Sequence, residues 1–80
     1  MAAPQVKISE KQKRRTMVLS MVEDLYRMKL SRYQLAKKTG ISYQTIQHWV
    51  NGKHFPSVRH MKQVYDYYTK EKNAYAQAAA

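Results

Sequence analysis

Residues 30–49 read LSRYQLAKKTGISYQTIQHW, and the predicted fold is built around this stretch. Ser31 and Gln34 have the spacing of a capping box, which predicts a short helix over residues 32–38. Gly40 follows, and glycine is suited to the left-handed conformation that ends a helix and turns the chain. The first half of the stretch therefore predicts a short helix and a sharp turn.

The second half predicts another short helix, over residues 43–50. Ser42 is a good N-cap for it, and Asn51-Gly52 end it as Gly40 ends the first. Two short helices thus meet across a turn of about three residues. The positions expected to face inward at this corner are Leu35, Ala36 and Ile41.

Longer helices are expected on both sides of this pair. Ser9 and Gln12 repeat the capping-box spacing, so a helix should start there and end near Met28 or Lys29. Ser57 can cap a fourth helix. The expected apolar stripes are Val18, Met21, Val22, Leu25 and Met28 in the first helix, and Val58, Met61, Val64, Tyr65 and Tyr68 in the fourth.

The length of 80 residues is typical of one small domain. With two glycines, two prolines and no sustained period-two alternation, the fold class should be all-α. We expect a flexible N-terminal arm over residues 1–8 and a helical domain over residues 9–69. The alanine-rich residues 70–80 form a C-terminal extension that continues the fourth helix, forms a fifth, or frays.

The charge predicts a polyanionic partner. Fifteen Lys and Arg stand against five Asp and Glu, a formal net charge of +10. No acidic residue lies between Asp24 and Asp66, where the positive residues are Arg27, Lys29, Arg32, Lys37, Lys38, Lys53, Arg59 and Lys62. The chain has no cysteine, and its longest nearly apolar stretch, residues 17–22, is too short to span a membrane. We therefore expect a cytoplasmic, nucleic-acid-binding protein without a membrane partner.

The central stretch resembles the helix-turn-helix of the lambda-repressor/Cro (Xre-type) family. The similar pattern is Leu-Ala, a Gly after three further residues, and then Ile-Ser-x-x-Thr-Ile-x-x-Trp, and it continues through residues 51–53 and 56–57. The resemblance implies a compact four- or five-helix lambda-repressor-like domain whose third helix enters the major groove of double-stranded DNA. It also implies a transcriptional repressor from a bacterium, phage or mobile element that binds a palindromic operator as a homodimer.

The helix over residues 43–50 sorts by face in agreement with this resemblance. Ile46, Trp49 and Val50 can anchor it to the core. The opposite face is polar and free of acidic residues, and a glutamine amide there can pair with adenine. The predicted base contacts are Tyr43, Gln44, Gln47 and His48, with Gln44 as the first choice; Gln47 could equally be solvated.

Backbone contacts are predicted on both sides of this helix. By resemblance, Arg32, Asn51 and Lys53 occupy positions where family members clamp the DNA backbone. Thr45 either packs or touches a phosphate. The start of the helix over residues 32–38 also points backbone donors outward, which suits phosphate.

Other features leave alternatives open. The basic run of residues 11–15 is either a solvated helix face or an arm that follows DNA. His48, His54 and His60 are spaced at six residues, which does not fit a helical metal pair, so no metal or other cofactor is expected. The five carboxylates form no convergent acid-base pair, so we do not expect an enzyme.

Other functions could use the same fold. They are a phage DNA-packaging or recombination accessory protein, and an antitoxin that binds a protein partner as well as its own promoter. RNA binding is also compatible with the positive charge. The Trp, Met and Tyr residues should be core residues because they fall on apolar helical stripes.

Overall fold

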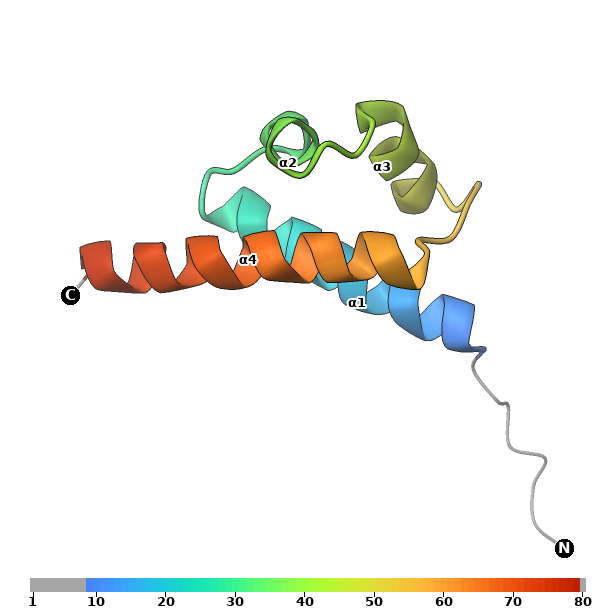
Figure 1. Ribbon diagram of the computed structural model, residues 1–80, viewed down its shortest axis with the longest axis horizontal. Coiled ribbons are helices and arrows are strands. Elements are labelled where there is room, and N and C mark those ends of the chain that lie inside the picture. Colours follow the sequence, from blue (N-terminus) through green and yellow to red (C-terminus); the bar gives the residue numbers. More distant parts are fainter. Residues whose placement is uncertain (1–8, 80) are drawn as a thin grey trace, which may run out of the picture.

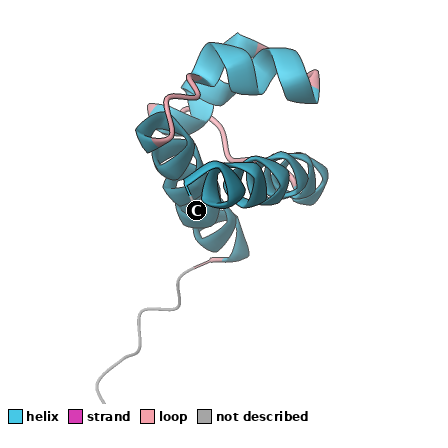
Figure 2. Cartoon of the chain, turned by 90° about the vertical axis from the view of Figure 1, so that its left-hand side faces the viewer, coloured by secondary structure: helices cyan, strands magenta, loops and turns pink. Residues whose placement is uncertain are grey.

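The computed structural model describes residues 9–79 and contains four helices in that range. They are α1 (Glu10–Arg27), α2 (Arg32–Thr39), α3 (Tyr43–Val50) and α4 (Val58–Ala79). The short helices α2 and α3 lie together on one side of the longer α1 and α4 (Figure 1). Seen from the side in Figure 2, residues 9–79 are helices joined by short loops. The predicted all-α fold is confirmed, and the predicted arm over residues 1–8 lies outside the described residues.

Helix α1 begins and ends where the sequence predicts. The Gln12 backbone N–H donates to Ser9 Oγ at 3.2 Å, and the Ser9 N–H donates to Gln12 Oε1 at 3.4 Å, which completes the capping box. After Arg27 the chain turns through Lys29, whose φ of 66° is left-handed. The Leu30 N–H then donates to the Leu25 carbonyl at 2.8 Å, which closes the end of the helix.

The turn between α2 and α3 agrees with prediction except at its last residue. Ser31 and Gln34 form the second capping box, and Gly40 ends α2 with a φ of 78°. Ile41 is buried in the corner. Ser42 is the N-cap of α3 as predicted, but its hydroxyl accepts no hydrogen bond from the helix. Ser42 and the first two residues of α3 are exposed, so water can satisfy these amides without a cap.

All four helices contribute to one core. Trp49 is its largest member and only 1% exposed, as predicted. The other core residues are Val18, Met21, Val22 and Leu25 of α1, Leu35 and Ala36 of α2, Ile41 of the turn, Ile46 of α3 and Val64 of α4. Ser57 caps α4 as predicted, since the His60 N–H donates to its Oγ at 3.1 Å.

The predicted core face of α4 is partly wrong. Val58 and Tyr65 are 61% and 53% exposed, whereas Tyr67 packs against the core beside Val64 and Tyr68. Each helical residue advances by about 100°, so two overlapping stripes of this helix both have helical spacing. Apolar and aromatic residues occur on both stripes, so spacing alone could not choose between them.

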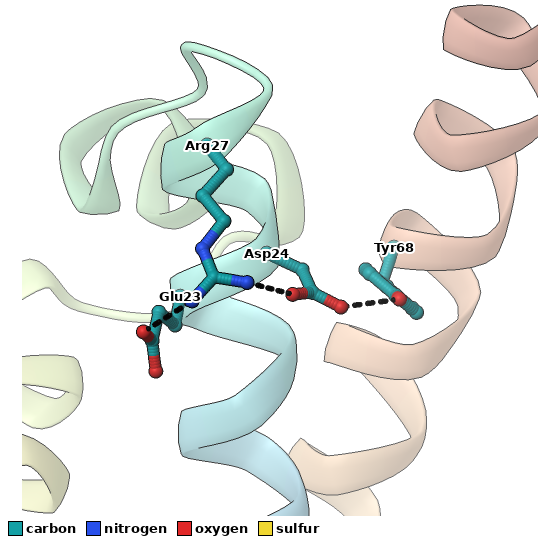
Figure 3. A network of polar contacts seen from close by, with 4 residues as sticks. All are labelled: Glu23, Asp24, Arg27 and Tyr68. Atoms are coloured by element: carbon teal, nitrogen blue, oxygen red, sulfur yellow. Dashed lines mark hydrogen bonds and ion pairs between the residues drawn. The ribbon is translucent and has the colours of Figure 1, made fainter.

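Helices α1 and α4 are tied by a polar network (Figure 3). The Tyr68 hydroxyl donates to Asp24 Oδ2 at 2.8 Å across the interface. On α1 itself, the Arg27 guanidinium lies 2.9 Å from Glu23 Oε1 and 3.7 Å from Asp24 Oδ1. The network pairs the half-buried Asp24 on both sides and holds the middle of α4 against α1.

Of the three possibilities for the C-terminal residues, the first is observed. Helix α4 continues without a break to Ala79, and its last turns extend past α2 (Figure 1). Within residues 9–79, no helix is both long and apolar enough to cross a membrane.

Candidate nucleic-acid interface

Helix α3 is anchored by its buried face and open on the other. Ile46 and Trp49 are 0% and 1% exposed, and Val50 is half-buried. On the opposite side, Tyr43 and Gln44 at the start of the helix are exposed. The anchor leaves this end of α3 fixed in place and facing solvent.

The four predicted base-contacting residues differ in their surroundings. Gln44 is exposed, and its amide has no hydrogen-bond partner among residues 9–79. Gln47 is half-buried, and its side-chain oxygen accepts a hydrogen bond from the Arg32 guanidinium. The half-buried His48 places its ring 4.9 Å from that of His54, centroid to centroid. The fourth residue, Tyr43, lies beside α2.

Tyr33 joins this surface, although the sequence did not indicate it. Its ring centroid lies 6.4 Å from that of Tyr43, and the two residues are 66% and 46% exposed. Their pairing depends on how α2 and α3 cross, which residue spacing does not show. The expectation that the tyrosines are core residues is wrong for Tyr33 and at three further exposed positions, Tyr26, Tyr65 and Tyr75, whereas Tyr43 is exposed as expected for the outward face of its helix. Tyrosine tolerates this exposure because its hydroxyl remains hydrated.

The predicted backbone-contacting residues lie within and around α3. Asn51 and Lys53 follow its C-terminal end and are exposed, while Thr45 is half-buried. Arg32, the first residue of α2, is half-buried and turned toward Gln47. No acidic residue interrupts the segment from α2 to the start of α4, so positive charge predominates in it. Acidic residues of the long helices lie near its edges, where Glu23 shares a hollow with Arg32 and Asp66 shares one with Lys38.

The basic run of residues 11–15 lies within α1 and has a role that the sequence did not indicate. Arg15 Nε donates to the Trp49 carbonyl at 2.8 Å, and its terminal nitrogen donates to the Val50 carbonyl at 3.2 Å. Arg14 Nε donates to the Pro56 carbonyl at 3.2 Å. These two arginines therefore hold the C-terminal end of α3 and the loop that follows it. Sequence patterns missed this role because the partners lie 34 to 42 residues away.

The lysines of the same run stay at the surface. Lys13 is exposed and lies 3.7 Å from Glu10 within the helix. Lys11 is exposed and lines a shallow hollow together with Arg14, Lys53 and Phe55. The run thus extends the positive surface of the loop after α3.

The histidines form no metal centre with other ligands. His48 and His54 are neighbours, but His60 instead packs its ring 5.5 Å from that of Trp49. In the part of the chain that the structure describes, no three His, Cys, Asp or Glu residues are close enough to hold a metal ion.

Comparison with known proteins identifies the family of this chain. A helix-turn-helix family model matches residues 25–68, which is more than half of the chain and covers α2, the turn, α3 and much of α4. No curated protein and no solved structure shows a significant match to the chain. The matched family is a DNA-binding one, and the matched residues of this chain include those on the exposed face of α3. The chain belongs to the Xre/lambda-repressor-type helix-turn-helix family and is a DNA-binding regulator of that type.

Proposed function

We propose that this protein is a sequence-specific transcriptional repressor of bacterial, phage or mobile-element origin, and that it inserts α3 into the major groove of its operator. One observation carries the proposal. The exposed face of α3 is polar and free of acidic residues, and the opposite face is locked into the core by Ile46 and Trp49. A rigid helix with exposed amides suits contact with base edges.

The contacts would divide by position along α3. Tyr43 and Gln44 at its start, with Gln47 and His48 one turn later, would contact bases. The proposed backbone contacts at its edges are Arg32, Thr45, Asn51 and Lys53. Phosphate contacts fix the register of a protein on the duplex, and base contacts supply specificity.

The operator is proposed to be palindromic and bound by a homodimer. Two copies related by a twofold axis would place their α3 helices in successive major grooves, about 34 Å apart along the DNA. The half-sites should therefore be centred about one helical turn apart.

Selection of bound duplexes from a random pool tests this function. The expected product is one palindromic sequence, and a matched RNA pool at the same salt concentration should yield no comparable enrichment. A pool that stays random after selection would contradict sequence-specific regulation. Capture of a defined protein partner together with random DNA would favour an accessory role instead.

Replacement of Gln44 provides a sharper test. Gln44→Ala should weaken binding to the selected operator by about 1 to 3 kcal/mol and leave binding to random duplexes and thermal stability nearly unchanged. Gln77→Ala is a matched control, because Gln77 is an exposed glutamine near the far end of α4. Equal losses on operator and random DNA would place Gln44 at a phosphate, and no loss on either would remove α3 from the groove.

A further inference from the structure

The hydrogen bond between Arg32 and Gln47 constrains what the Gln47 amide can offer to DNA. A guanidinium carries only N–H donors, so the amide atom that faces it must be the oxygen. The orientation of the amide is therefore determined chemically. Arg32 takes one of the two lone pairs of this oxygen and holds the oxygen toward α2, so the NH₂ group is the part of the amide that Arg32 leaves unpaired.

The local structure supports this orientation. Gln47 is the fifth residue of α3 and lies one turn after Tyr43 and Gln44. Arg32 reaches it from the first turn of α2 and is half-buried. Arg32 lines a mostly apolar hollow together with Leu19, Val22, Glu23, Tyr26 and Val50. Contact with apolar surface limits the freedom of the arginine stem and thereby helps to hold the Gln47 amide.

Gln44 lies three residues earlier on the same helix and is not constrained in this way. Its exposed amide can present a donor and an acceptor together, the combination that pairs with adenine. The two glutamines therefore have the same chemistry but different hydrogen-bonding capacity. Because the two side chains are identical, the difference in hydrogen bonding comes from their positions in the structure.

We propose that Gln47, oriented by Arg32, acts as a hydrogen-bond donor that selects guanine in the operator. In the major groove guanine presents two acceptors, N7 and O6, whereas adenine presents one acceptor beside a donor and cytosine presents a donor. An NH₂ group whose amide oxygen is held toward Arg32 matches the guanine edge and opposes the amino groups of adenine and cytosine. Arg32 acts as a positioning residue, and its other N–H groups remain free for a phosphate. This inference rests on the proposed function, because it assumes that α3 enters the groove.

The experiment begins with operators selected by the wild-type chain and by Gln47→Ala. The base pair whose preference disappears in Gln47→Ala should be a guanine-cytosine pair. Replacing that guanine with 7-deazaguanine, which lacks the N7 acceptor, should weaken wild-type binding about tenfold and leave Gln47→Ala binding unchanged. Inosine at the same place is the control, because it keeps N7 and O6 and should bind as guanine does.

Two substitutions of Arg32 test the positioning role. Arg32→Met keeps an apolar stem but frees the Gln47 oxygen, so the preference for guanine over adenine at this pair should fall about tenfold. Arg32→Lys still offers only donors and should retain most of the preference. The ratio of two affinities is the readout, so a uniform loss from a missing phosphate contact does not affect it.

Several results would overturn the inference. They are an adenine or cytosine at the Gln47-dependent pair, no pair that depends on Gln47, a wild-type chain indifferent to 7-deazaguanine, or an unchanged guanine preference in Arg32→Met. If Arg32→Met does not fold, the 7-deazaguanine measurement on the wild-type chain still decides. A selected operator without a Gln47-dependent pair refutes this inference alone, whereas a pool with no sequence preference refutes the proposed function as well.

Discussion

Arg15 should matter more for stability than any other residue of the basic run of α1. Its guanidinium donates to the Trp49 and Val50 carbonyls at 2.8 and 3.2 Å. These carbonyls belong to the last turn of α3, where helix carbonyls lack partners within the helix and the helix dipole favours a positive charge. Arg15 thus closes the end of the helix that we propose to enter the groove.

The size of the effect follows from these two bonds. A hydrogen bond to a charged group contributes about 1.5 to 3 kcal/mol, but Arg15 is half-buried, and water can replace part of each bond once the guanidinium is gone. We therefore expect Arg15→Met to lower the free energy of unfolding by about 2 kcal/mol in total. That loss is a substantial share of the roughly 4 to 12 kcal/mol typical of a domain of this length.

Urea unfolding followed by circular dichroism measures the change. With a slope of about 1 kcal/mol per molar urea, the midpoint should fall by roughly 2 M. Lys11→Met is the matched control, because it removes a positive charge from an exposed position of the same helix and should leave the midpoint nearly unchanged. Equal midpoints for the two variants would refute this reasoning. Weaker DNA binding without lost stability would show instead that Arg15 contacts DNA.

Three further predictions concern the core, the charge and the pH dependence. Trp49→Ala should cost about 3 to 5 kcal/mol because the indole is 1% exposed, and a variant that melts like the parent chain would contradict the packing. Lys53→Ala should weaken binding to operator and random duplexes alike and reduce the slope of log K against log salt by about 1. Lys70→Ala on α4 serves as the control. An unchanged slope would mean that Lys53 makes no backbone contact. Burial, and secondarily the charge of Glu71, raises the pKa of Tyr67, so the unfolded chain loses the Tyr67 hydroxyl proton at a lower pH than the folded chain does. Stability should therefore fall as pH rises above about 10. Urea titrations should show a smaller fall in stability for Tyr67→Phe, and equal falls would contradict the role of Tyr67.

Local signals in the sequence predicted most element boundaries correctly. Both capping boxes and the left-handed Gly40 depend on residues within three or four positions of one another. The same is true of the buried positions of α2 and α3, because a short helix with one apolar stripe has one way to face the core. The family resemblance follows from these same residues and agrees with the match over residues 25–68.

The core face of α4 could not be predicted in the same way. Val58 and Tyr65 fit a helical stripe as well as Val64 and Tyr68 do, and only the positions of the other helices decide which stripe is covered. The pairing of Tyr33 with Tyr43 likewise depends on the crossing of α2 and α3. Valine and tyrosine are found both at protein surfaces and in cores, so their identity in the sequence does not show which of the two environments they occupy.

The sequence alone predicts the order of the first four helices, the turn between the two short ones, and the polar face of residues 43–50 without acidic residues, but it leaves a fifth helix over residues 70–80 open. These features arise from contacts between near neighbours and from charge, which a sequence shows directly. The packing of the helices was needed to show that Arg15 closes the end of α3 and that Arg32 hydrogen-bonds to the oxygen of Gln47 but not to that of Gln44. Those hydrogen bonds join residues 15 or more positions apart, and their geometry exists only after the helices have packed.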